Sequence, residues 1–324
     1  MRVCVFGAGA IGGHLAARLA RGGAEVSVIA HGAHLEAIKS NGIRIEAPDI
    51  TFTEKLRATS NPADLGPQDA VLVTTKTPAL ATVATTIAPL LGPNTPVAFV
   101  VNGIPWWYPA EPKIDSIDPN DVIRTHIGLT RAIGSTVYSS CEVTSPGVVN
   151  VGHIRNRIVF GELGGEISAR CEAIAAPLRA AGFTVDITPD IRTAVWSKLL
   201  MNLASGPIGV LTQSAGHANL AEPAIEAAQR AIYAEGAAIA QALGCTPQLD
   251  IEASITNGRT SHHRSSIVQD LMLGRPMEIA TLYDATLHLA RQSGVPTPVL
   301  DMLVALVRVR AREAGLYSLT NRND

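Results

Sequence analysis

The sequence predicts an α/β domain built on a parallel sheet, followed by an all-α domain. In the first half, short runs that are apolar on both faces alternate with helical segments, as in a parallel sheet covered by helices on both sides. After residue 188, every segment with a clear pattern is helical. The chain has 324 residues, of which 47% are hydrophobic, and this is enough for two cores. We therefore expect two domains, residues 1–188 and residues 189–324.

The chain opens with a strand-like run that leads into three glycines and an amphipathic helix. Gly7 permits a tight turn, Gly9 leaves room for phosphates, and Gly12 lets the helix and the strand pack closely. The helix N-terminus adds free amide donors and a partial positive charge. A second apolar run at residues 25–30 completes a βαβ unit, so we predict a Rossmann-like parallel-sheet domain rather than a glycine turn without a ligand. The loop expected to bind a dinucleotide comprises Gly7, Ala8, Gly9, Ala10, Ile11 and Gly12.

Composition favours small-molecule chemistry over binding to a polymer or a membrane. The net charge of -2 provides no basic surface for nucleic acid or for an acidic membrane. No apolar stretch approaches the ~20 residues of a membrane span, and the first apolar run is a strand rather than a secretory signal. We therefore expect a cytoplasmic protein. The four cysteines lack metal-ligand spacing and are expected to be reduced and buried.

The remaining elements follow from apolar periodicity and from turn residues. In the first domain we expect helices at 32–41, 82–91 and 168–181, strands at 43–46, 51–56, 69–76, 96–102 and 184–187, and a β-rich segment at 122–163. In the second domain we expect helices at 191–205, 222–243, 247–257, 265–273, 278–293 and 298–314. Thr188 is the expected N-cap of the first of these, with Pro189 in its first turn, and Gly258 is expected to end the third.

The carboxyl ends of the strands indicate where a cofactor binds. In a parallel sheet the ligand lies at those ends, where Lys76 and Asn102 are found. A solvated lysine and a plain Asn-Gly turn are the alternatives for these two residues. After the second strand, an enzyme that uses NAD has an acid for the ribose, whereas this chain has His31. Without that acid, and with His31 and Lys76 as donors, the sequence favours NADP.

Two polar residues share one face of the first helix of the second domain. Lys198 and Asn202 are four residues apart and are surrounded by apolar residues, which is unusual for a solvated stripe. The alternative for Lys198 is a lysine at the helix rim that reaches water. An ammonium in such a place can neutralise charge on a carbonyl oxygen and supply a proton.

Further polar residues gather at two later helix starts. Glu278 is a candidate acid, although it could only stabilise the helix dipole, and Ser266 is a candidate ligand, although it could only be a cap. His262 and His263 do not predict a metal site, because adjacent histidines point to opposite sides and no cysteine or acid cluster completes one.

These motifs together resemble one family. They are Gly7-x-Gly9-x-x-Gly12, Thr75-Lys76, Val101-Asn102-Gly103-Ile104, Trp196-Ser-Lys198 with Asn202, and Ser265-Ser266-x-x-Gln269-Asp270 followed by Glu278-Ile279. In this order and spacing the chain resembles, nearly end to end, the ketopantoate reductase (2-dehydropantoate 2-reductase) family. The resemblance implies NADPH-dependent reduction of ketopantoate or a related branched 2-oxo acid, with the substrate held between the two domains.

The resemblance also implies a role for each site residue. Lys198 matches the catalytic lysine and Glu278 its supporting acid. Asn202 and Ser266 match substrate-binding residues, Asn102 the inter-domain asparagine, and Lys76 the cofactor lysine. Four positions depart from the family pattern, and they concern the cofactor phosphate and the substrate pocket: His31 for arginine, Gly206 and His263 for asparagines, and Ala280 for aspartate.

Two alternatives remain open at this point. A β-hydroxyacid dehydrogenase also pairs such domains and uses a lysine, but the Asn102-Gly103 turn and the serine pair count against it. A non-catalytic NADP sensor would need neither Lys198 nor Glu278. We further expect Trp106 and Trp107 to line the mouth of the site rather than to anchor a core. The sequence leaves the substrate and the oligomeric state undecided, a homodimer being one alternative.

Overall fold

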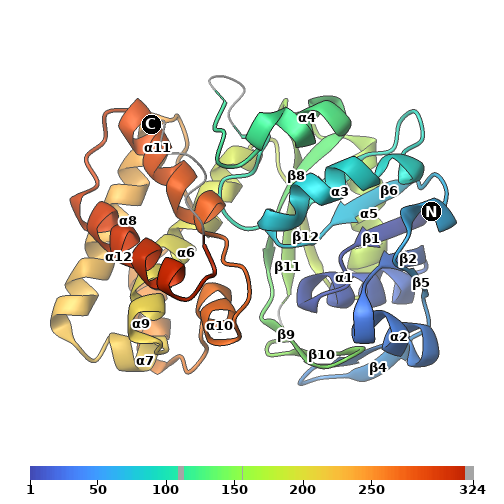
Figure 1. The fold of residues 1–324 in the computed structure, drawn as a ribbon, viewed down its shortest axis with the longest axis horizontal. Helices are drawn as coiled ribbons and strands as arrows, with labels where there is room; N and C mark the ends of the chain where they lie inside the picture. Colours follow the sequence, from blue (N-terminus) through green and yellow to red (C-terminus); the bar gives the residue numbers. More distant parts are fainter. Residues whose placement is uncertain (109–112, 155, 318–324) are drawn as a thin grey trace. The chain divides into compact units, whose positions relative to one another are not determined.

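The computed structural model describes residues 1–108, 113–154 and 156–317. The chain forms two compact units. Unit 1 comprises Met1–Val101 and Asn120–Ile191, and unit 2 comprises Asn102–Pro119 and Arg192–Asp324. Figure 1 shows the strands in unit 1 and a set of helices in unit 2. An α/β region followed by a helical region is therefore confirmed, whereas the expected boundary at residue 188 stays a prediction. By compactness, the segment 102–119 groups with the helices.

Unit 1 is organised around an eight-stranded sheet with the order β12-β11-β8-β7-β6-β1-β2-β5. All neighbouring strands are parallel except β8 and β11, which pair antiparallel. The strands are β1 (Arg2–Phe6), β2 (Glu25–Ile29), β5 (Arg57–Thr59), β6 (Ala70–Val73), β7 (Val97–Phe99), β8 (Ala132–Tyr138), β11 (Arg157–Glu162) and β12 (Thr184–Ile187). The predicted parallel sheet is thus present, with one antiparallel pair inside it.

Both faces of this sheet are buried, which explains why its strands read as continuous apolar runs. Side chains alternate between the two faces along a strand. In β1, Val3 and Val5 belong to the core that contains Leu15 and Leu19 of the first helix, while Cys4 on the other face is equally buried. A strand covered on both sides needs apolar residues at every position.

Five α-helices and a second sheet complete the described part of unit 1. The helices are α1 (Ala10–Arg21), α2 (Gly32–Asn41), α3 (Leu80–Thr86), α4 (Val122–His126) and α5 (Ala169–Ala180). Helix α1 packs against α5, and α3 against α4. The second sheet has the order β4-β3-β10-β9, with β3 (Ile43–Glu46), β4 (Thr51–Glu54), β9 (Cys141–Ser145) and β10 (Val148–Val151). The sequence predicted neither α4 nor β5, because both are short.

Unit 2 contains the helices that follow Ile191, the first residue of α6, which belongs to unit 1. They are α6 (Ile191–Thr212), α7 (Gly216–Asn219), α8 (Pro223–Ala242), α9 (Ile251–Thr260), α10 (Ser266–Met272), the π-helical turn η6 (Ala280–Asp284), α11 (Ala285–Gln292) and α12 (Pro298–Glu313). Across the described ranges of the chain, no helix combines the length and the apolar character that crossing a membrane requires.

Three local expectations about these helices are wrong. Helix α6 does not end at residue 205 but continues through Gly206 and Pro207. Thr188 is not its N-cap, because the Thr188 hydroxyl accepts a hydrogen bond from the Asp190 amide before the helix begins at Ile191. Gly258 lies inside α9 and does not terminate it. Glycine and proline are local signals, and packing overrides them.

Candidate functional site

The glycine loop of unit 1 has the geometry that a tight strand-to-helix connection requires. Gly7 has a φ of +107°, which side chains rarely adopt. A Cβ on Gly12 would overlap the Gly7 carbonyl oxygen, so only glycine allows α1 to start this close to the loop. Gly9 is different, since no atom lies within 4 Å of the place where its Cβ would be. Two glycines therefore serve the fold, and Gly9 leaves open space at the N-terminus of α1.

The loop lies at the point where the strand order of the sheet reverses. Strand β1 has β2 on one side and β6 on the other, and ligands of open α/β sheets bind at such a switch point. The residues after β6 hold the loop, because the Thr74 hydroxyl donates to the Gly7 carbonyl oxygen at 2.6 Å. The buried Thr75 hydroxyl beside Gly7 has no hydrogen-bond partner in the described part of the chain. Lys76 follows directly and is exposed.

The two histidines at the start of α2 differ in role. His31 precedes the helix as its N-cap residue and is exposed at the end of β2. His34, which the sequence pattern did not indicate, bridges the glycine loop to the second sheet. Its Nε2 donates to the Ala8 carbonyl oxygen at 2.5 Å, and its Nδ1 accepts from the Gly147 amide at 3.0 Å. Nothing in the local sequence signals this link, because the two partners are far apart along the chain.

In unit 2, α6 carries the candidate catalytic lysine. Lys198, Asn202 and Gly206 follow one another at intervals of four residues and so share a face. Both polar side chains are half-buried, between fully buried neighbours such as Leu199 and Leu203. Burial lowers the pKa of Lys198 to about 8. This lysine can therefore lose or gain a proton near neutral pH, unlike a lysine in water.

The candidate acid Glu278 lies beside the π-helical turn η6. It is buried, and its backbone carbonyl oxygen accepts from the Leu282 amide at 3.1 Å. π-Helical turns are rare and are frequent at functional sites. The same turn receives the Asn102-Gly103 segment, because the Ile104 amide donates to the Thr281 carbonyl oxygen at 2.8 Å. Unit 2 thus brings the backbone next to Asn102 against the helix that begins after Glu278.

The serine pair lies at the start of α10, as expected. Ser265 is the N-cap residue, but its side chain makes no capping hydrogen bond, and its buried hydroxyl has no partner among the described residues. Ser266 is the first residue of the helix and is exposed. A plain cap is therefore not the role of either hydroxyl.

The expectation for the tryptophan pair is wrong. Trp106 and Trp107 are each only 2% exposed and belong to the core of unit 2. Trp107 packs against Tyr108 with ring centroids 6.3 Å apart, and the Tyr108 hydroxyl accepts from Nε1 of Trp196 at 2.7 Å. Both side chains are buried because removing a large aromatic ring from water stabilises the folded protein strongly. Their position after a strand end does not change this.

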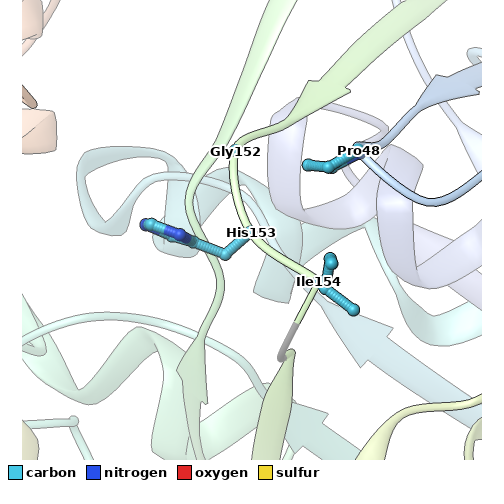
Figure 2. Close-up of a pocket in the computed structure, with 4 residues that line it drawn as sticks. All are labelled: Pro48, Gly152, His153 and Ile154. Atoms are coloured by element: carbon cyan, nitrogen blue, oxygen red, sulfur yellow. The ribbon is translucent and has the colours of Figure 1, made fainter.

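Two further features of the described residues concern metal binding and a surface pocket. Among the described residues there is no set of three or more His, Cys, Asp or Glu that could hold a metal ion. Figure 2 shows a pocket of about 360 Å³ in unit 1, lined by Pro48, Gly152, His153 and Ile154. In this view the His153 ring points away from Pro48 and Ile154. No predicted site residue lines that pocket.

The four cysteines are free, as expected, but the prediction that all four are buried is wrong for one of them. Three of them are buried, and Cys141 is half-buried beside His14, with Sγ and Nδ1 3.3 Å apart. Burial raises the pKa of Cys141 to about 11 and, with the nearby Arg18, lowers that of His14 to about 3. Both groups are therefore neutral at pH 7, and they do not form a reactive thiolate pair.

Comparison with known proteins covers almost the whole chain. The family model described as "Ketopantoate reductase PanE/ApbA" matches residues 3–165, and the one described as "Ketopantoate reductase PanE/ApbA C terminal" matches residues 190–311. A 2-dehydropantoate 2-reductase from Mesorhizobium japonicum is 40% identical over 328 residues, which cover 98% of this chain and 100% of that protein.

Solved structures share the fold over the same length. A crystal structure described as a candidate ketopantoate reductase from Ralstonia solanacearum MolK2 has a TM-score of 0.89 and 37% identity, with 98% of this chain and 99% of the other covered. A D-mandelate dehydrogenase, in a ternary structure with NADH and anilino(oxo)acetate, has a TM-score of 0.83 at 20% identity, covering 98% and 100%. The second likeness concerns the fold alone.

Proposed function

This chain belongs to the ketopantoate reductase PanE/ApbA family and is a 2-dehydropantoate 2-reductase-like oxidoreductase, and we propose that it reduces ketopantoate or a closely related branched 2-oxo acid with NADPH. The observation that carries this proposal is Lys198, a half-buried lysine whose pKa burial lowers to about 8, on the helix face that also carries Asn202. The 2-dehydropantoate 2-reductase from M. japonicum, 40% identical, supports the choice of ketopantoate.

The glycine loop fits a dinucleotide. The open space at Gly9 and the unpartnered buried hydroxyl of Thr75 lie where a pyrophosphate would approach the N-terminus of α1. The amides of Ala10, Ile11 and Gly12 in the first turn would donate to the phosphates, and the Gly7 to Gly9 backbone would border them. A bound nicotinamide cofactor supplies the hydride in this class of reaction.

We propose NADPH rather than NADH because of the residue that follows β2. His31 is exposed there, at the N-cap of α2, and no acid occupies that position. Lys76 is exposed after β6 and adds positive charge on the same unit. An acid would favour the ribose hydroxyl of NAD, whereas an imidazole and an ammonium can donate hydrogen bonds to a 2′-phosphate.

The ammonium of Lys198 performs the acid step. As the ketone carbon is reduced, negative charge develops on the carbonyl oxygen, and a protonated amine within hydrogen-bond reach neutralises it and donates its proton. The apolar neighbours of Lys198 strengthen this interaction, because the local dielectric constant is low. The lowered pKa also reduces the cost of giving up the proton.

The other candidates bind and orient. We assign Glu278 to orient the lysine or to bind the nascent hydroxyl group. Asn202 and Ser266 would bind hydroxyl and carboxylate groups of the substrate, and Asn102 would assist from the segment held against η6. Groups that bind ground state and transition state alike lower KM without raising kcat.

A substrate panel and one variant test the proposal. Wild-type protein is assayed with NADPH and NADH on ketopantoate and on other branched, linear and aromatic 2-oxo acids. Lys198→Ala should lower kcat by about 10²–10³, the usual cost of losing one positioned donor, while NADPH still binds. Lys39→Ala, which removes an exposed lysine of unit 1, is the control and should change neither value.

The outcomes separate the alternatives. Turnover of 3-hydroxy acids in place of 2-oxo acids would favour a β-hydroxyacid dehydrogenase. NADPH binding without turnover of any substrate would favour a sensor. A Lys198→Ala variant that retains more than about a tenth of wild-type kcat would show that another group is the acid.

A further inference from the structure

A glycine stands in the interior of the longest helix, where it costs stability. Gly206 lies within α6, and glycine in a helix interior is about 1 kcal/mol less favourable than alanine. A Cβ at this position would overlap the hydroxyl oxygen of Tyr283. The next nearest atoms, Cγ2 of Ile267 and Cζ of Tyr283, are both 3.5 Å away, which is an ordinary contact distance. This oxygen atom must therefore move before any residue larger than glycine can occupy position 206.

That oxygen is itself costly. Tyr283 is fully buried, and its hydroxyl has no hydrogen-bond partner among the residues that the structure describes. Burial raises the pKa of Tyr283, so the group is a neutral phenol. A buried hydroxyl without a partner costs about 1–3 kcal/mol. Phenylalanine at 283 with alanine at 206 would fill the same space without either cost.

Both residues lie on, or directly after, the elements of unit 2 that carry the candidate catalytic groups. Gly206 is two turns from Lys198 on the same face of α6. Tyr283 lies in η6, the π-helical turn that begins two residues after Glu278. Sequences depart from locally favourable choices mainly where function requires it. The meeting of two such residues indicates that the contact has a function.

A second glycine approaches the same π-helical turn closely. Gly103 has a φ of +83°, and a Cβ there would be 2.5 Å from the carbonyl carbon of Thr281. The Ile104 amide donates to the Thr281 carbonyl oxygen at 2.8 Å. Two close approaches, at Gly103 and at Gly206, thus involve the consecutive residues Thr281, Leu282 and Tyr283.

We propose that Gly206 and Tyr283 are positioning residues, whose contact sets the separation of α6 and η6 and thereby the placement of Glu278 relative to Lys198. The hydroxyl acts as a spacer against the bare Cα of Gly206. The inference rests on the proposed function, because that function gives Lys198 and Glu278 their roles. It adds a reason why the pair keeps an unfavourable glycine and an unfavourable hydroxyl.

The test is a double-mutant cycle on the full chain, with kinetics on the 2-oxo acid that the panel identifies. Gly206→Ala should lower kcat by about 10–100-fold, because a displacement of about 1 Å near reacting groups costs up to ~10² in rate. The limb of the pH profile that reports Lys198 should move as well. In Gly206→Ala/Tyr283→Phe the clashing oxygen is gone, so kcat and the pH profile should return to within about threefold of wild type.

Two further variants separate positioning from mere stability. Gly258→Ala changes a glycine inside α9 whose Cβ would meet only Cδ1 of Leu220, the flexible end of a side chain, at 2.7 Å. It should keep wild-type kcat and pH profile even if thermal unfolding shifts. Tyr283→Phe alone removes the spacer, so it should lower kcat by about threefold or more and move the pH profile. It should nevertheless unfold at the same or a higher temperature, because it removes an unpaired buried hydroxyl.

Each other outcome overturns the inference. A double variant as slow as Gly206→Ala, or Gly206→Ala with wild-type kcat and pH profile, would show that the contact does not position the acid. A rise in KM alone for Tyr283→Phe would make the hydroxyl a substrate ligand. If no 2-oxo acid is reduced, or if Lys198→Ala stays active, the proposed function fails and this inference fails with it. If Lys198→Ala is inactive and the double variant is not rescued, only this inference fails.

Discussion

Nε2 of His34 donates a hydrogen bond to the carbonyl oxygen of Ala8 in the glycine loop, at a distance of 2.5 Å. The ring is held on its other side, because the Gly147 amide donates to Nδ1 at 3.0 Å. A carbonyl oxygen can only accept and an amide can only donate, so the ring is the neutral tautomer with its proton on Nε2. The second sheet therefore helps to fix the loop that is proposed to hold the cofactor.

His34→Ala should weaken NADPH binding more than it lowers kcat. It leaves two backbone groups without a partner, which costs about 1–3 kcal/mol and loosens the loop. We expect the NADPH Kd to rise at least about fivefold, as measured by fluorescence titration, with kcat at saturating NADPH little changed. His153→Ala in the same unit is the control. An unchanged Kd together with a lower Tm would assign His34 to stability alone.

Alanine at two glycines of the loop should affect two different properties, folding in one case and cofactor binding in the other. Gly12→Ala should prevent normal folding, because its Cβ would overlap the Gly7 carbonyl oxygen. Gly9→Ala should fold with an unchanged Tm, since no atom lies within 4 Å of the new Cβ, yet it should bind NADPH at least about tenfold more weakly. Thermal unfolding and cofactor titration on both variants decide this. If Gly9→Ala still binds NADPH tightly, the cofactor phosphates do not approach the chain at this residue.

An acid at residue 31 should change the cofactor preference. His31→Asp places a carboxylate at the N-cap of α2, where it would bind a ribose hydroxyl and repel a 2′-phosphate. The ratio of kcat/KM for NADPH over NADH should fall by about tenfold or more. His31→Asn, which has the shape but not the charge, serves as the matched control. Equal ratios for the wild type and the Asp variant would place the phosphate elsewhere.

The rate of reduction should fall as pH rises through about 8. The acid must be protonated to donate, and burial lowers the pKa of Lys198 to about 8. Reduction should therefore be fastest below that pH, and oxidation of the product, which needs the neutral amine, should increase over the same range. Measuring kcat in both directions from about pH 6 to about pH 10 tests the sign. A reduction rate that increases through this range would contradict the assignment.

The sequence by itself determined the elements whose patterns are local. The continuous apolar run of β1, the glycines of the first loop and the four-residue interval between Lys198 and Asn202 all lie within short stretches. For that reason the fold class, the family and most of the helices were predicted. The roles of the site residues stay predictions, because they depend on a bound substrate and cofactor.

Tertiary structure alone decided the features that join distant parts of the chain. Helix α6 continues through Gly206 and Pro207, although both residues are locally unfavourable in a helix interior. Trp106 is buried because its large apolar surface is more stable in the core of unit 2 than at a site mouth. His34 finds its partner Gly147 only after both sheets have formed. Such contacts depend on where the fold brings residues together, and sequence spacing carries no record of that.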